Sequence, residues 1–284
     1  MKEMMIRALT GALFLVVMVG GMVWNAMSFA LLFTVVTALT LWEAYGLVNR
    51  QDGVDVNRVI GTTAGTYMFV AFFAASVGIE GLSVPLLFLP WLITLIYLLM
   101  SELYLCHTQP LHSWAYTMWG QLYVAFPFAL LPMLYFGYSW FIPLAIFIFL
   151  WCSDTGAYCC GSLLGRHKLF PRISPGKSWE GSIGGGLITV LVSQVIVWLG
   201  PSTILADGTA VVFGLTALQW AGFALVVVVF GTWGDLVESL LKRTLGVKDS
   251  GNILPGHGGM LDRFDSSLLA IPAAAGYLLT LELF

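Results

Sequence analysis

Most of the side chains that could do chemistry in this chain gather between residues 230 and 265, where the sequence reads FGTWGDLVESLLKRTLGVKDSGNILPGHGGMLDRFD. A helix exposed to lipid would not tolerate this mixture, because unpaired charge in hydrocarbon is unfavourable. The stretch must therefore lie within protein, in water or against a bound charged ligand. Its ionisable residues are Asp235, Glu238, Asp249, Asp262 and Asp265, together with Lys242, Arg243, Lys248, Arg263 and His257.

These residue types are the ones that phosphoryl or nucleotidyl transfer requires. Carboxylates suit hard cations such as Mg²⁺, which proteins hold through a few carboxylates plus the phosphates of the substrate. Lysine and arginine side chains bind phosphate oxygens, and the PGHGG turn offers an open backbone rich in amides. In such reactions the protein does little covalent work. We therefore interpret the stretch as a site for a nucleoside triphosphate and its metal ions.

A second polar stretch, residues 161–180, combines glycines with four basic residues. Glycines let backbone amides approach a phosphate, and cationic side chains neutralise it. A basic loop that rests on anionic lipid headgroups is the alternative, but the cluster SPGKSWEG favours a phosphate role. It is not a Walker A loop, because the first glycine and its spacing are absent. Ser174 or Ser178 is expected to cap the helix that follows. The basic residues are Arg166, Lys168, Arg172 and Lys177.

The elements that position these stretches are predicted to be membrane-spanning helices. Hydrophobic residues make up 59% of the 284 residues and charged residues only 10%, whereas soluble domains carry roughly a quarter charged residues. We predict an all-α polytopic membrane protein with about nine transmembrane helices of about 20 residues each and two polar cytoplasmic loops, 161–180 and 231–265. The predicted spans are 8–24, 27–48, 59–78, 84–105, 121–138, 141–160, 181–199, 211–230 and 266–284.

The basic residues also predict an orientation. With nine spans, all 12 lysines and arginines fall on one side, which the positive-inside rule identifies as cytoplasmic. The N-terminus and both polar loops are then cytoplasmic, the C-terminus lies outside, and the location is the inner (plasma) membrane. We expect one integral membrane domain over residues 1–284, with N-terminal spans in 1–138 and a catalytic half in 139–284. Prolines 127, 132 and 143 are expected to break or kink the fifth and sixth spans.

Three acidic residues lie within or at the end of predicted spans, and an ionisable group at membrane depth indicates function. Asp154 and Asp235 adjoin the two polar loops and have glycines beside them. Glu43 is either an interfacial residue or part of a site, and the sequence leaves both open. The glycine run 184–186 is interpreted as tight helix packing, since no strand precedes it.

The run SLLKRTLGVKDSGNILPGHGGMLDRFD resembles the signature of the phosphatidate cytidylyltransferases, also called CDP-diacylglycerol synthases. The resemblance continues in SDTGAY (153–158), LLGRHKL (163–169), ISPGKSWEG (173–181) and GDLVES (234–239). It implies that CTP and phosphatidate react to CDP-diacylglycerol and pyrophosphate with a divalent metal, usually Mg²⁺. A second cation and a homodimer are left open, and no nucleic-acid partner is expected.

The same resemblance implies roles for individual residues. Asp235 and Asp262 are the expected metal ligands. The basic residues expected to bind phosphates are Lys242, Arg243, Lys248 and Arg263. Asp249, His257 and Asp265 would support the metal or orient substrate in the catalytic site. The expected substrate-binding residues are Ser239, Lys177, Arg166, Gly258, Gly259 and Asp154.

Three other functions stay open at this point. A CTP-dependent polyprenol- or phytol-type lipid kinase also joins a nucleotide to a membrane lipid, although the full PGHGG-x-x-DR-x-D run favours the cytidylyltransferase. A secondary transporter would also carry intramembrane acids, but no inverted repeat is evident and the polar residues crowd on one side. A non-catalytic membrane scaffold would leave so many unfavourable charges unexplained.

Overall fold

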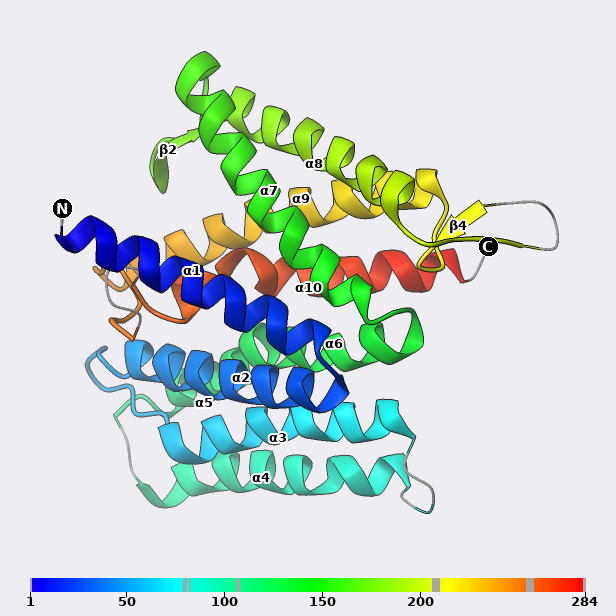
Figure 1. The fold of residues 1–284 in the computed structure, drawn as a ribbon. Helices are drawn as coiled ribbons and strands as arrows, with labels where there is room; N and C mark the ends of the chain where they lie inside the picture. The colour runs from blue at the N-terminus through cyan, green and yellow to red at the C-terminus, as the bar shows by residue number, and fades with distance from the viewer. Residues whose placement is uncertain are drawn as a thin grey trace. The chain divides into compact units, whose positions relative to one another are not determined.

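The computed structural model describes residues 2–78, 81, 83–105, 108–205, 210–253 and 258–282, and most of them are helical (Figure 1). Eight helices in these ranges are long and apolar enough to cross a membrane, and Leu9–Val23 is a shorter apolar helical segment. The predicted all-α polytopic membrane fold is therefore confirmed. Two short antiparallel hairpins add to the helices, and the sequence did not predict them.

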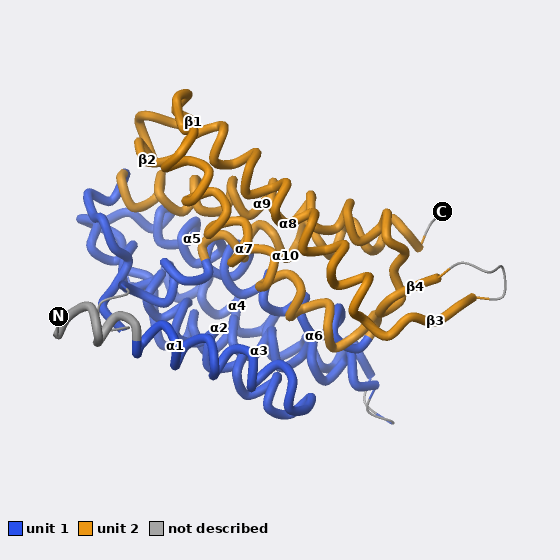
Figure 2. The backbone as a smooth tube through the Cα atoms, turned by 45° about the horizontal axis from the view of Figure 1, so that its top comes forward, with its two compact units in different colours: residues 1–136, 244–264 blue, residues 137–243, 265–284 orange. Residues whose placement is uncertain are grey.

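The chain divides into two compact units (Figure 2), which are described separately. Unit 1 comprises residues 1–136 and 244–264, and unit 2 comprises residues 137–243 and 265–284. The first boundary falls near the predicted one between residues 138 and 139, but part of the polar stretch groups with the N-terminal unit. The assignment of one integral membrane domain stays a prediction.

Unit 1 is built from long helices around an aromatic core. Phe33 packs with its ring centroid 5.0 Å from that of Phe29, 6.4 Å from Phe69 and 6.2 Å from Phe128. All four side chains are fully buried. The helices are α1 (Lys2–Val23), α2 (Ala26–Val48), α3 (Arg58–Val77), α4 (Val84–Leu105), α5 (Pro110–Trp119), the π-helix η1 (Gly120–Ala125) and α6 (Phe126–Gly137).

The prolines of the fifth predicted span do not end it. Residues 110–137 form one apolar span, in which the Phe126 N–H bonds to the Gln121 carbonyl five residues back. This wider turn precedes Pro127, which has no N–H to donate. It also places the Gln121 amide where it donates to the Tyr45 hydroxyl at 2.9 Å and to the Gly61 carbonyl at 2.8 Å. The expected disruption is therefore absorbed locally.

Unit 2 contains the helices that carry Asp154, Asp235 and Glu238. Its core includes Trp220, whose ring lies edge-on to those of Phe149 and Phe223 and whose indole N–H donates to the Val212 carbonyl at 2.9 Å. The elements are α7 (Phe141–Leu164), β1 (Lys168–Phe170), β2 (Ser174–Ser178), α8 (Trp179–Leu199), β3 (Ser202–Ile204), β4 (Ala210–Val212) and α9 (Ala217–Thr244). Strand β1 pairs with β2 and β3 with β4.

Glycines bring the backbones of α7 and α8 into contact. A Cβ atom at Gly185 would lie 2.5 Å from the Ser153 carbonyl oxygen, and one at Gly181 would lie 2.8 Å from that of Ala157. Gly156 of α7 faces the Gly185 Cα in the same way. Such small-residue contacts replace the hydrophobic effect as a source of helix association in membranes. The interpretation of the glycine run as helix packing is confirmed.

The predicted loop 231–265 is wrong at both ends, because helices extend into it. Helix α9 continues to Thr244, with Lys242 and Arg243 in its last turn, where cations interact favourably with the helix dipole. The final helix, α10 (Leu261–Leu281), begins in unit 1 and continues in unit 2. The predicted start of the eighth span was also too early, since reciprocal bonds between Thr216 and Gln219 form a capping box there.

We predict that Gly185→Ala destabilises the protein because its methyl group would collide with the α7 backbone. Overpacking of this kind costs about 1–3 kcal/mol, so the apparent Tm in detergent should fall by several degrees. Gly276→Ala is the matched control, since nothing lies within 4 Å of a Cβ at this position of α10. Equal melting temperatures for the two variants would contradict the proposed packing.

Candidate active site

The centre of the candidate site in unit 2 is an ion pair between β2 and α9. Lys177 Nζ lies 2.5 Å from Asp235 Oδ2, and the two side chains are only 24% and 27% exposed. Ser239, one helical turn further along α9, donates its hydroxyl to Asp235 Oδ1 at 3.1 Å. Both oxygens of this carboxylate are therefore held in defined directions. Predicted residues from two separate parts of the sequence therefore meet here.

A polar cavity of about 540 Å³ surrounds this pair. Asp154 of α7 contributes a second carboxylate to the lining of this cavity, in addition to that of Asp235. Hydroxyl groups and glycines complete the wall, so the cavity offers acceptors and one ammonium group. The other lining residues are Ser153, Ala157, Tyr158, Gly161, Ser162, Gly176, Ser178, Gly181, Ser182 and Thr232.

Negative charge is concentrated near this cavity. The carboxylates of Asp235, Glu238 and Asp154 all act electrostatically on Asp265, which is partly buried in α10. Glu238 itself is fully buried and lies 2.6 Å from Lys242 Nζ, one turn along α9. A buried carboxylate needs such a partner, since its desolvation is otherwise uncompensated. Lys242 is thus tied to Glu238, and its expected role in binding phosphate stays a prediction.

In unit 1, Glu43 binds the described parts of the signature loop, which we define as residues 245–253 and 258–260. The Glu43 side chain is only 7% exposed, and it accepts hydrogen bonds from the backbone N–H groups of Met260 at 2.9 Å and Leu261 at 3.1 Å. The Ser250 hydroxyl donates to the same carboxylate in a short hydrogen bond. A Cβ atom at Gly251 would lie 2.5 Å from Glu43 Oε2. Glu43 is therefore buried in protein and binds the backbone of this loop as a clamp, which favours the second of the two roles that the sequence left open.

Asp262, an expected metal ligand, completes this clamp from the first turn of α10. Its Oδ2 atom accepts the backbone N–H groups of Ser250 and Gly259, both at 2.9 Å. Gly258 has a φ of +82°, a left-handed conformation that glycine adopts without strain. Asp262 therefore orients the loop through one oxygen, whatever its other oxygen binds.

The β1–β2 hairpin is fixed by Glu180, a residue to which the sequence assigned no role. Its carboxylate accepts the backbone N–H groups of Arg166 and His167, and it lies 2.6 Å from the His167 ring nitrogen Nδ1. The predicted cap is also present, because the Ser178 hydroxyl accepts the Gly181 N–H at the start of α8. Together they hold the strand that carries Lys177. The signal was available, since Glu180 stands in the first turn of the predicted helix.

The predicted site residues are distributed over both units. Those in unit 2 are Asp154, Arg166, Lys177, Asp235, Ser239, Lys242, Arg243 and Asp265; those in unit 1 are Lys248, Asp249, Gly258, Gly259, Asp262 and Arg263. Arg166, Arg243, Lys248, Asp249 and Arg263 are exposed, as expected of side chains that would meet a soluble anion. His257 lies outside the described residues.

Within the described ranges, no three Asp, Glu, His or Cys side chains are arranged to hold a metal ion by themselves. The donor set still suits a hard cation. Asp235 and Asp154 share a polar cavity, and Mg²⁺ is commonly held through one or two carboxylates plus substrate phosphates and water. An ion bound in this way would take its remaining ligands from water and from the substrate phosphates.

Comparison with known proteins gives a match along nearly the whole chain. The sequence model described as the cytidylyltransferase family covers residues 5–281. The curated relatives include the phosphatidate cytidylyltransferase of Haemophilus influenzae, 42% identical over 132 residues, which are 46% of this chain and 43% of that protein. The protein of the same name from Staphylococcus aureus strain COL is 45% identical over 126 residues, which are 44% of each chain. The chain thus spans less than half the length of these relatives.

We predict that Glu43→Gln destabilises unit 1, because the new amide group would place a donor against backbone N–H groups. Leaving buried donors unsatisfied costs about 1–3 kcal/mol each. Thermal unfolding in detergent should show a lower Tm than for the wild type. Asp52→Asn, an exposed change in the same unit, is the control, and an unchanged Tm for Glu43→Gln would contradict the clamp.

Proposed function

The chain belongs to the cytidylyltransferase family, and on that premise we propose that it transfers the cytidylyl group of CTP to phosphatidate. The products would be CDP-diacylglycerol and pyrophosphate, and the reaction would serve phospholipid biosynthesis. The observation that carries the proposal is the cavity of unit 2, in which Lys177 and Asp235 form an ion pair beside Asp154. The relatives that are similar to this chain bear the name of this activity.

The reaction needs positioning and charge stabilisation more than proton transfer. A phosphate monoester such as phosphatidate is already an anion near neutral pH. Its oxygen would attack the α-phosphorus of CTP, forming a new P–O bond while the bond to the bridging oxygen breaks and pyrophosphate leaves with the electron pair. Lys177 is placed to neutralise phosphate charge, and the glycine backbone around Gly176 gives the anion close access. Ser239 keeps the Asp235 carboxylate oriented during this step.

We infer that Mg²⁺ is the cofactor and that Asp235 is one of its ligands. When bound, such a cation neutralises the triphosphate and orients its α-phosphorus. The crowding of carboxylates around Asp265 supports the inference, since a cation would offset their mutual repulsion. Asp262 of unit 1 remains a proposed metal ligand. A second cation and a homodimer also remain proposals, and they rest on the family resemblance.

We also propose that the protein lies in the inner membrane with the N-terminus and the polar loops in the cytoplasm, where CTP is found. The location of all 12 basic residues on one predicted side supports this orientation. Alkaline phosphatase fused behind α10 should be active, whereas a fusion in the loop after α2, at Asp52, should be inactive. The reverse pattern would overturn the orientation.

The experiment that tests the proposed activity uses purified protein with phosphatidate, CTP and Mg²⁺, and measures pyrophosphate release together with CDP-diacylglycerol by mass spectrometry. We expect both products in equal amounts, and none after EDTA. Phosphorylation of an added polyprenol with release of CDP would favour the lipid kinase instead. If folded protein forms neither product, the proposed function is wrong.

We predict that Asp235→Asn and Lys177→Met each lower kcat/KM by about a hundredfold or more, the loss typical for removal of a charge that stabilises a transition state. Because the ion pair is partly buried, each variant should be checked for an unchanged elution volume. Asp52→Asn serves again as the control for charge removal. Near-normal turnover by Asp235→Asn would contradict its assignment as a ligand.

A further inference from the structure

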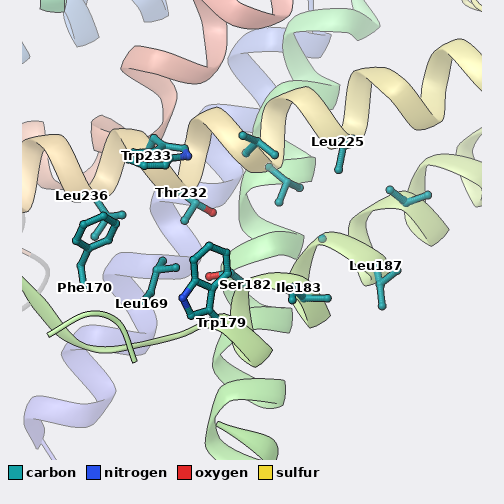
Figure 3. Close-up of a pocket in the computed structure, with 14 residues that line it drawn as sticks. Leu169, Phe170, Trp179, Ser182, Ile183, Leu187, Leu225, Thr232, Trp233 and Leu236 are labelled. Atoms are coloured by element: carbon teal, nitrogen blue, oxygen red, sulfur yellow. The ribbon is translucent and has the colours of Figure 1, made fainter. Parts of the chain in front are cut away.

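An apolar groove in unit 2 adjoins the polar cavity. It has a volume of about 480 Å³ and lies between α8 and α9, with strand β1 at one end. Figure 3 shows Phe170, Trp179 and Trp233 towards the hairpin end of the groove, and Leu187 and Leu225 towards the other end. Its floor is formed by the buried residues Gly186 and Val228. Since a Cβ at Gly186 would lie 3.6 Å from Val228, the groove owes part of its depth to this glycine.

The groove and the polar cavity are adjacent and share part of their lining. Ser182 of α8 and Thr232 of α9 line both of them. On one side of these two hydroxyls the lining is wholly aliphatic and aromatic, and on the other side lie Lys177 and Asp235. A ligand that occupied both spaces would need an apolar chain joined to an anionic head.

The dimensions and the mouth of the groove suit a lipid tail. From Ser182 to Val190 the groove follows α8 for about 12 Å at about 1.5 Å per residue, close to the ~15 Å of hydrocarbon in one leaflet. Trp179 and Trp233 are half exposed at its head end, and tryptophan favours the boundary between headgroups and hydrocarbon. Phe170 packs edge-on against Trp233 with ring centroids 5.9 Å apart, which closes that end under the hairpin.

We propose that this groove binds one acyl chain of the lipid substrate, so that the lipid phosphate reaches Lys177 past Ser182 and Thr232. The inference rests on the proposed function and adds to it the place where the lipid enters. It predicts that kcat/KM depends on the length of the acyl chain, because the groove ends at Val190 of α8 and Leu225 of α9.

The test compares dipalmitoyl and dihexanoyl phosphatidate in mixed micelles of fixed composition. Val190→Trp and Leu225→Trp would fill the far end of the groove. We expect the ratio of kcat/KM for the long-chain to the short-chain substrate to fall about fivefold, because the methylenes displaced from the groove lose their packing contacts there. Leu191→Trp is the matched control, because Leu191 is exposed on α8 next to Val190 but outside the groove.

The outcomes separate the two proposals. If the wild type forms no CDP-lipid from either substrate, the proposed function fails. If the wild type is active and both groove variants keep its ratio, the acyl groove is wrong, and a changed oligomeric mass would then assign the groove to a second copy of the chain. If the variants lose activity towards both substrates, the wild type is photolabelled with a phosphatidate that carries a diazirine in its acyl chain. We expect the label on residues 182–190 and 225–236. Labelling elsewhere overturns the proposal.

Discussion

The need to partner every buried carboxylate governs this structure more than any other constraint. The chain is mostly apolar, so an acidic side chain inside it has no water to solvate it and must find donors in the protein. Glu43 finds backbone N–H groups and a serine hydroxyl, Asp235 finds Lys177 and Ser239, and Glu238 finds Lys242. The bonds of Glu43 to backbone N–H groups and the ion pair of Asp235 with Lys177 also join segments that are far apart in the sequence.

The two units use this constraint for different purposes. In unit 1 the carboxylates of Glu43 and Asp262 bind backbone amides, and they shape a loop that glycines allow to pass closely. In unit 2 the carboxylate of Asp235 binds an ammonium group at the wall of a polar cavity. A backbone clamp stabilises a conformation, whereas a solvent-accessible ion pair can open to exchange one partner for a phosphate or a cation. The second arrangement is the one suited to chemistry.

The sequence predicted the membrane fold for physical reasons, and it singled out residues that line the polar cavity without predicting the cavity itself. Long apolar runs have few alternatives to spanning helices, and Asp154, Lys177 and Asp235 stood out because each was unusual where it occurred. The sequence could not assign Glu43, because its hydrogen bond to Ser250 joins residues 207 positions apart. Helix ends were misplaced around the signature loop, because polar residues were taken to indicate a loop although α9 continues through them to Thr244. Pairing by side chains, and not polarity alone, decides where such a helix ends.

The most direct test of the whole account is to follow the phosphorus atoms of CTP separately. Purified protein would be given phosphatidate, Mg²⁺ and CTP labelled either at the α- or at the γ-phosphorus, and the lipid phase would be counted. The account predicts that the α-label enters the lipid and that the γ-label leaves as pyrophosphate. Entry of the γ-label into the lipid would contradict cytidylyl transfer and show that the same site acts as a kinase.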